Sequence, residues 1–200
     1  MPPRPDVSEE RKAQILEAAT MVFTKHGFAD ARMDDIVSQS GLSKGAIYWY
    51  FDSKDAIIVS ILDQIFDYET GYIRELLERE DSAKMKLEVF VETTIKELEK
   101  MKPLMPIFFD FWSLSVRKKT INQTIKRYYQ SFLDLVEPVL EQGIQQGEFR
   151  PVVVSETAIA IGAMLEGTIL FYVYFSDIID LERQFRTNLD LILEGICIKP

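Results

Sequence analysis

Helix-start and helix-stop residues recur along the whole chain, and they constrain its fold more than any other feature. Ser or Asp, whose side chains accept free N–H groups at a helix start, repeatedly precedes apolar residues spaced three or four positions apart. The first such segment begins at Ser8, carries Ile15, Ala19 and Phe23 on one side, and stops at Gly27. Alternating strand patterns are nearly absent, so the sequence predicts an all-α fold. Further helices are expected at about residues 34–40, 43–50, 53–80, 82–101, 103–116, 120–146, 155–174 and 180–195.

Single residues set several of these boundaries. Glycine ends a helix because it adopts the left-handed conformation, Ser and Asp cap helix starts, and proline bends a helix by removing an N–H donor. The expected stop is Gly41, the expected caps are Ser43, either Asp52 or Ser53, and Ser155, and the expected bend is at Pro138.

Composition narrows the class of protein. The apolar content of 47% suffices to bury a sizeable core. The single cysteine, Cys197, excludes a disulfide framework within the chain and suits a reducing, cytoplasmic setting. The start of the chain has no apolar leader. The apolar stretch at 157–175 carries Glu166 near its middle, where a charge costs roughly 3 kcal/mol in a bilayer, so we expect a buried helix there and no membrane partner.

An enzyme is one alternative class, and the sequence argues against it. Helical metal sites need several His, Cys or Glu-x-x-His ligands, and this chain has one histidine, His26, and one cysteine. A glycine-rich phosphate loop and a nucleophile elbow are both absent from the sequence. No catalytic residue, metal or cofactor is therefore expected.

The charge balance does not by itself favour nucleic acid as a partner. The chain carries a net charge of −9, and residues 1–58 hold seven Lys or Arg against nine Asp or Glu, a net of −2. Because phosphate contacts need basic groups, DNA binding must rest on where individual residues are placed.

Residues 33–52 nevertheless fit the spacing of a helix-turn-helix motif. Such a motif needs a glycine in the turn and apolar residues that seat one helix on the other. Gly41 occupies the turn, while Val37 stands where a smaller alanine is usual. The expected packing positions are Ile36, Leu42, Ile47 and Tyr50.

The second helix of this motif is the expected recognition helix. Its start presents free N–H groups that suit a phosphate, and Gly45 permits close approach. The residues expected to face a DNA groove are Lys44, Ala46, Tyr48 and Trp49. Tyr48 and Trp49 could instead pack in a core, but neighbouring apolar residues already supply the inward face, so DNA contact is favoured.

The chain resembles the TetR family of one-component transcriptional regulators. The resemblance rests on "ILEAATMVFTKHGF" and "MDDIVSQSGLSKGAIYWYFDSKDAI", and less specifically on "GEFRP" followed by "AIGAMLEGTILFY". It implies a three-helix DNA-binding domain at residues 1–51 and a ligand-binding and dimerisation domain at 52–200, bridged by the helix from about residue 53. By this resemblance Tyr48 contacts phosphate, Lys54 holds a backbone phosphate, and the DNA-reading helix carries Ser43, Lys44, Gly45, Ala46, Tyr48 and Trp49.

One position departs from the family pattern. Arg32 stands where the family commonly has Thr or Ser, which cap the second helix and bind a phosphate. Arginine cannot accept the N–H bond of a cap but can pair with a phosphate directly. We therefore expect Arg32 to contact DNA, with Asp30 as a candidate replacement cap.

Seven large rings between residues 104 and 132 predict a ligand pocket in the helical body. Core packing explains most such stripes, yet this number exceeds what one helical stripe needs, and ligand cavities favour aromatic walls with a few polar groups. An acidic residue beside aromatic faces suits a cationic or hydrogen-bonding ligand, and Thr168 is a further candidate polar group. The expected effector-binding residues are Phe66, Phe108, Phe109, Asp110, Trp112, Tyr128, Phe132 and Glu166.

These patterns and the TetR resemblance together predict a DNA-binding transcriptional regulator. The resemblance implies a repressor that a small hydrophobic effector releases from a palindromic operator in double-stranded DNA, with an activator as the other mode of regulation. We expect a homodimer formed by the last two helices, because two-fold dimers read palindromes. The apolar repeat expected at that interface is Phe185, Leu189, Ile192 and Leu193. The alternative is a helix-turn-helix protein that acts through protein partners without a small-molecule inducer.

Overall fold

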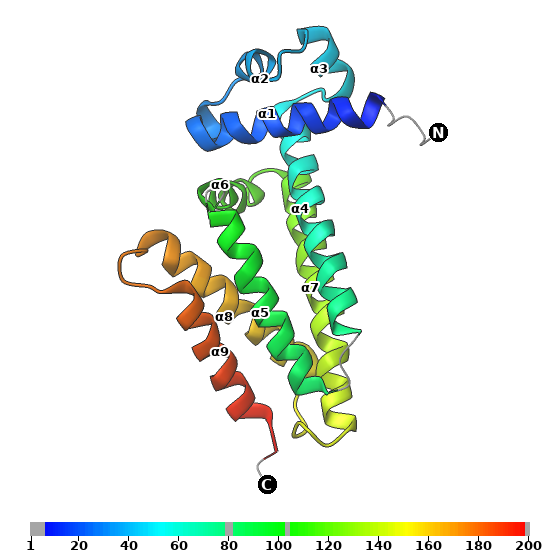
Figure 1. Ribbon diagram of the computed structural model, residues 1–200, viewed down its shortest axis with the longest axis vertical. Coiled ribbons are helices and arrows are strands. Elements are labelled where there is room, and N and C mark those ends of the chain that lie inside the picture. Colours follow the sequence, from blue (N-terminus) through cyan, green and yellow to red (C-terminus); the bar gives the residue numbers. More distant parts are fainter. Residues whose placement is uncertain (1–6, 79–81, 103–104, 199–200) are drawn as a thin grey trace. The chain divides into compact units, whose positions relative to one another are not determined.

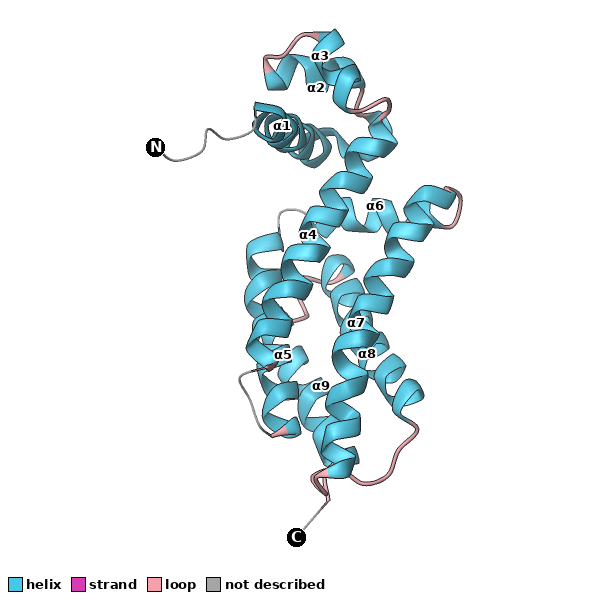
Figure 2. Ribbon diagram, turned by 90° about the vertical axis from the view of Figure 1, so that its right-hand side faces the viewer, coloured by secondary structure: helices cyan, strands magenta, loops and turns pink. Residues whose placement is uncertain are grey.

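The computed structural model describes residues 7–78, 82–102 and 105–198, and they are helical almost throughout (Figures 1 and 2). In this part of the chain the only extended pairing is an isolated bridge between Phe149 and Cys197. The expected all-α fold is confirmed. The helices are α1 (Val7–Asp30), α2 (Met33–Ser40), α3 (Lys44–Tyr50), α4 (Lys54–Leu77), α5 (Ala83–Met101), α6 (Met105–Ser115), α7 (Lys119–Gln145), α8 (Val154–Tyr174) and α9 (Leu181–Ile196).

The predicted boundaries around the helix-turn-helix motif are confirmed. Gly41 follows α2 with φ 69° and ψ 10°, the left-handed conformation that glycine adopts without steric cost. The hydroxyl of Ser43 accepts the N–H of Ala46 at 3.2 Å and so caps α3. Of the two candidate caps of α4, Ser53 is the one that accepts a helix N–H, from Ala56 at 3.1 Å.

The predicted cap at Ser155 is wrong. Val153 occupies the N-cap of α8 and makes no side-chain cap hydrogen bond, whereas Ser155 is already the second residue of the helix. Serine is a preferred N-cap residue, which is why the sequence predicted a cap at Ser155. The observed helix α8 begins without a side-chain cap. Helix packing can set a boundary that local propensity does not.

The chain forms two compact units. The first contains residues 1–66 and 103–126, and the second contains residues 67–102 and 127–200. In the first unit α1 packs against α2 and α6, and α2 packs against α3. The fully buried side chains there include Phe23, Ile36 and Phe111. The functional boundary expected at residue 51 remains a prediction, because compactness groups α6 with the N-terminal helices.

The second unit packs α9 against both α5 and α8. Phe185, Leu189 and Leu193 of α9 are all buried within the protomer. The core of the same chain therefore takes up these three side chains of the predicted dimer interface, whereas Ile192, the fourth, is half-buried. A dimer formed by the last two helices remains a prediction. The hydrophobic repeat of α9 marks its inward face, and Leu191 is the exposed leucine on this helix.

Helix α8 carries more apolar side chains than the core of the second unit buries. Its inner face buries Ala158, Ile161 and Leu165, but only 22% of its most apolar stretch is buried. The expectation of a buried helix holds for one face alone. By length and composition α8 could cross a membrane, but one such helix is weak evidence, since a core helix of a soluble protein meets the same test.

Gly143→Ala is expected to destabilise the second unit. A Cβ at this position would lie 2.1 Å from Cδ2 of Phe149, a ring that is fully buried. Overpacking of this kind costs about 1–3 kcal/mol. Thermal unfolding followed by circular dichroism measures the loss. Gly71→Ala, in a helix with open space around it, is the matched control and should be neutral or slightly stabilising.

Candidate nucleic-acid interface and ligand cavity

Helix α3 buries one side and exposes the other. Ile47 is fully buried against the motif, whereas Trp49 is 84% exposed and Tyr48 is 44% exposed. A rotation of about 100° per residue places consecutive side chains on different faces, so seating Ile47 turns the two aromatic residues outward. Tyr48 and Trp49 are therefore not core residues of the N-terminal helices. Large exposed aromatic side chains side by side on a short helix are suited to contact with a partner.

The rest of the predicted reading face is also accessible. Ser43, Lys44 and Gly45 are exposed, and Ala46 is half-buried. A side chain at Gly45 would meet no atom within 4 Å, so the glycine leaves the helix backbone open to a close partner. The start of α3 is thus open to close approach at Gly45, while the Ala46 N–H is bonded to the Ser43 hydroxyl.

Lys44 is engaged with an acidic neighbour. Its ammonium lies 2.7 Å from the carboxylate of Asp34 on α2, and both side chains are well exposed. The hydrogen bond that Lys44 donates to Asp34, together with the negative charge of Asp34, raises the pKa of Lys44. Lysine therefore stays protonated, and a phosphate must compete with Asp34 for it.

Arg32 occupies the N-cap of α2, and its side chain makes no capping hydrogen bond to the helix. Its backbone N–H instead donates to the carboxylate of Asp35 at 2.9 Å, which is the reciprocal half of a capping box. The candidate replacement cap is wrong, because Asp30 is the last residue of α1. The side chain of Arg32 is exposed and does not cap the start of α2.

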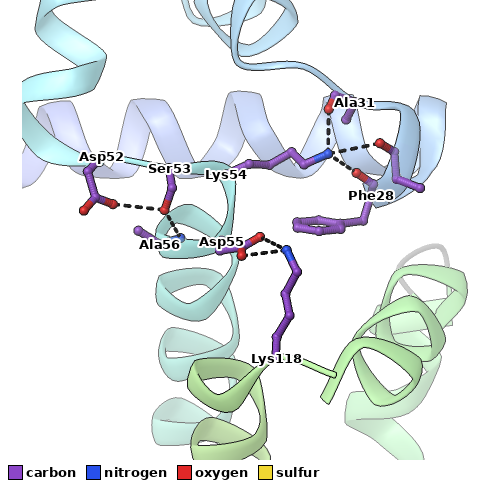
Figure 3. Close-up of polar contacts among 9 residues, drawn as sticks. Phe28, Ala31, Asp52, Ser53, Lys54, Asp55, Ala56 and Lys118 are labelled. Atoms are coloured by element: carbon purple, nitrogen blue, oxygen red, sulfur yellow. Dashed lines mark hydrogen bonds and ion pairs between the residues drawn. The ribbon is translucent and has the colours of Figure 1, made fainter. Parts of the chain in front are cut away.

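Lys54 lies at the start of α4 and reaches the end of α1 (Figure 3). Its ammonium donates to the carbonyl oxygens of Phe28, Ala29 and Ala31, the last at 2.7 Å, and lies 4.5 Å from the centre of the Phe28 ring. Burial and the neighbouring Lys118 lower the pKa of Lys54. An ammonium has three N–H donors, so these carbonyls already use its hydrogen-bonding capacity.

Two further contacts complete this cluster, and each joins residues that lie far apart in the sequence. The ammonium of Lys118 binds both carboxylate oxygens of Asp55, at 2.7 and 2.6 Å (Figure 3). Gly27 interrupts α1 with φ 71° and ψ 161°, and the freed N–H of Phe28 donates to Asp110 at 3.1 Å. These partners lie 63 and 82 positions apart in the chain.

The predicted effector residues fall into two groups. In the first unit the ring of Phe108 lies 6.2 Å from the rings of both Phe66 and Trp112, and Asp110 binds the Phe28 N–H. The side chain of Phe109 lies outside the described residues. The second group, Tyr128, Phe132 and Glu166, lines a cavity in the second unit.

This cavity is bounded by segments of α4, α5, α7 and α8, and its volume is about 80 Å³. One water molecule needs about 10–15 Å³ by this measure, so the space admits a small organic molecule. Its walls are chiefly aromatic and aliphatic, and they include Tyr129, one of the seven rings noted in the sequence. The sequence did not identify Phe90, Thr94, Glu97 or Gly162 as part of the walls. These residues could not be recognised from the sequence because each lies on a helix that also carries an ordinary stripe of core residues.

Glu166 is an ionisable group on the wall of this cavity. Burial raises the pKa of its carboxyl group to about 7. Thr168, another candidate polar group, is taken up in the core: its hydroxyl accepts from Asn188 at 2.8 Å and donates to the carbonyl of Met164. Glu166 is therefore the polar group at this cavity whose ionisation can respond to what enters.

Two family models match the chain. Residues 15–61 match the family described as "Bacterial regulatory proteins, tetR family", and residues 86–178 match "Tetracyclin repressor-like, C-terminal domain". The first match contains the whole helix-turn-helix motif. The second contains most of the residues around the cavity.

Relatives and solved structures agree with these matches. An uncharacterised HTH-type transcriptional regulator of Bacillus subtilis, YfiR, is 31% identical over 150 residues, covering 72% of this chain and 70% of its own. The fold is similar to that of FadR from Bacillus subtilis with stearoyl-CoA (TM-score 0.80, 24% identity, 92% and 98% of the two chains covered). It is also similar to a regulator from Saccharomonospora viridis with choline (TM-score 0.86, 20% identity, 96% and 100% covered). By its helix-turn-helix surface, both domain matches and this relative, the chain belongs to the TetR family of bacterial transcriptional regulators.

Proposed function

We propose that this DNA-binding transcriptional regulator is a homodimeric repressor, which a small hydrophobic effector releases from a palindromic operator. The observation that carries the DNA-binding part is the outward pair Tyr48 and Trp49 on a helix whose opposite side, Ile47, is fully buried. Two such helices related by a two-fold axis would enter successive major grooves of a palindrome.

The residues proposed to bind DNA divide by role. Arg32, Tyr48 and Lys54 contact phosphates and determine affinity and its salt dependence. The start of α3 offers N–H groups to a phosphate, aided by Ser43 and Gly45. The face formed by Lys44, Ala46, Tyr48 and Trp49 enters the groove and determines sequence choice.

Dimerisation is supported by the apolar surface that α8 leaves uncovered. Phe171 is 57% exposed, and Ile159, Leu170 and Tyr174 of the same helix are exposed as well. Several large apolar side chains exposed on one helix are suited to a protein interface. The proposed dimer pairs this face of α8, with Leu191 of α9, against its symmetry mate, while the buried stripe of α9 stays in each core.

The effector is proposed to bind in the cavity lined by Tyr128, Phe132 and Glu166. Family structures solved with stearoyl-CoA and with choline support a role for small molecules. Release from DNA requires that the effector bind the DNA-free form more tightly than the DNA-bound form. Phe66, Phe108, Phe109, Asp110 and Trp112 remain proposed effector residues.

The competing function is a helix-turn-helix protein that acts through protein partners. It requires the exposed face of α3 to have no DNA target. A gel shift against the region upstream of the protein's own gene separates the two functions. Retardation of a palindromic fragment supports the repressor, and its absence across the neighbouring promoters supports the alternative.

Trp49→Ala is expected to change which operator sequences are bound. A groove contact contributes about 1–3 kcal/mol of discrimination, whereas the fold should be unaffected because this side chain is 84% exposed. Selection of bound sequences from a randomised library, compared with the wild-type protein, measures the change. Met21→Ala, at an exposed apolar side chain of α1, is the control. An unaltered preference would remove Trp49 from the reading face.

Lys54→Ala is expected to have two separable effects. Loss of the ammonium leaves three carbonyls at the end of α1 without a donor, which should lower the melting temperature by the equivalent of about 1–3 kcal/mol. If Lys54 also holds a phosphate, affinity falls for all DNA sequences and the salt slope decreases by about 1. Lys25→Ala, at an exposed lysine of α1, controls for the loss of charge. A lower melting temperature with an unchanged salt slope would assign Lys54 a structural role alone.

The wild-type protein is expected to have twice the 23.1 kDa mass of one chain in solution. Phe171→Glu should shift light scattering toward the single-chain mass, because a charge would be buried at the proposed interface without a partner. Val116→Glu places the same charge at another highly exposed apolar position and should leave the mass unchanged. A wild-type mass of one chain at micromolar concentration would contradict the dimer.

A further inference from the structure

Two carboxylates line the cavity of the second unit, and their surroundings differ. Glu97 on α5 pairs with Lys100 at 2.7 Å. Glu166 on α8 has no hydrogen bond or ion pair within the described residues, and no described residue that lines the cavity carries a positive charge. Burying an ionised carboxylate is costly unless a partner compensates it. The protein therefore holds a carboxyl group at the cavity wall whose charge no neighbour balances.

Aromatic rings surround the space in front of this group. Phe90 and Phe132 lie with ring centres 5.9 Å apart, and Tyr128 and Tyr129 with centres 5.7 Å apart, and all four line the cavity. The faces of aromatic rings carry partial negative charge and attract cations within about 6 Å. Rings and carboxylate thus favour the same sign of charge.

The backbone of α8 brings these parts close together. Gly162 lies one turn before Glu166, on the same side of the helix. A Cβ at Gly162 would lie 2.9 Å from Cε1 of Phe132, so the glycine is what allows that ring to approach the helix. Ring and carboxylate therefore occupy neighbouring positions along one wall.

We infer that the ligand of this cavity is a lipophilic cation, an ammonium whose nitrogen lies against the Glu166 carboxylate while its apolar body contacts the surrounding rings. This inference rests on the proposed function, since it names the class of the proposed effector. An anion would be repelled by Glu166, and a neutral hydrocarbon would leave the carboxylate uncompensated. A cation is the class that satisfies both the charge and the rings.

The affinity of the cavity for a cation should increase with pH. Burial raises the pKa of Glu166 to about 7, so the carboxylate forms as the pH rises through neutrality. Among the described residues, the other titratable groups that line the cavity are Glu97 from α5 and Tyr128 and Tyr129 from α7, while α4 contributes Thr70 and Ile73. A cation of fixed charge should bind about tenfold more tightly at pH 8 than at pH 6, because the ionised form of Glu166 is the minor one at the lower pH.

A matched pair of probes tests this inference directly. Phenyltrimethylammonium and tert-butylbenzene have nearly the same shape and differ in charge. Calorimetric titration of the full-length protein at pH 8 should show the cation binding at least about tenfold more tightly than the hydrocarbon. Equal or tighter binding of tert-butylbenzene, or no binding of the cation at millimolar concentration, overturns the inference.

Variants locate the site. Glu166→Gln should remove the preference for the cation and its pH dependence, whereas Glu141→Gln, at an exposed carboxylate of α7, should retain both. Gly162→Ala keeps the carboxylate but pushes Phe132 toward the cavity, so it should weaken both probes. Cation affinity in Glu166→Gln equal to that of the wild type would overturn the assignment.

A gel shift on the same samples separates this inference from the proposed function. Release of the operator by the cation supports both. Tight, Glu166-dependent binding of the cation without release supports the ligand class and contradicts release by this effector. Release by tert-butylbenzene alone keeps the proposed function and overturns the ligand class.

Discussion

The burial of Ile36 and Ile47 beneath the turn at Gly41 is the constraint on which the DNA-binding surface depends. Helix α3 has only seven residues, and a helix of two turns is not stable alone in water. It exists because its apolar side is seated on α2. The same seating leaves Tyr48 and Trp49 no place in the core, so the packing of one side of α3 determines the chemistry of the other.

A second requirement comes from the polar end of α1. The last carbonyl groups of a helix have no partners within it and need donors from elsewhere. Here Lys54 of α4 supplies the donors, and Asp110 of α6 accepts the N–H that the break at Gly27 sets free. Completing the end of α1 thus draws in residues from distant parts of the chain. This explains why residues 103–126 belong to the same compact unit as the N-terminal helices.

Glu148 and Glu166 of the second unit differ in their hydrogen-bond partners. Glu148 accepts hydrogen bonds from the Ser82 hydroxyl at 2.8 Å and from the N–H groups of Ala83 and Lys84, and so holds the start of α5 in place. Glu166 faces a cavity and receives no such bonds from the described residues. A carboxylate satisfied by the fold contributes to structure, whereas one left unsatisfied beside a cavity is available to a ligand.

The sequence by itself determined the helices, the turn at Gly41 and the outward face of α3, because periodicity, capping and glycine conformation act over a few residues. The aromatic cluster also led to the prediction that Tyr128, Phe132 and Glu166 bind a ligand, and the fold places all three around one cavity; their ligand role remains a prediction. Only the tertiary structure decided that the apolar repeat of α9 faces the core, since two interfaces of one helix share the same period. It alone joined Lys54 to the end of α1, because contacts between residues more than twenty positions apart depend on how helices pack and leave no local pattern in the sequence.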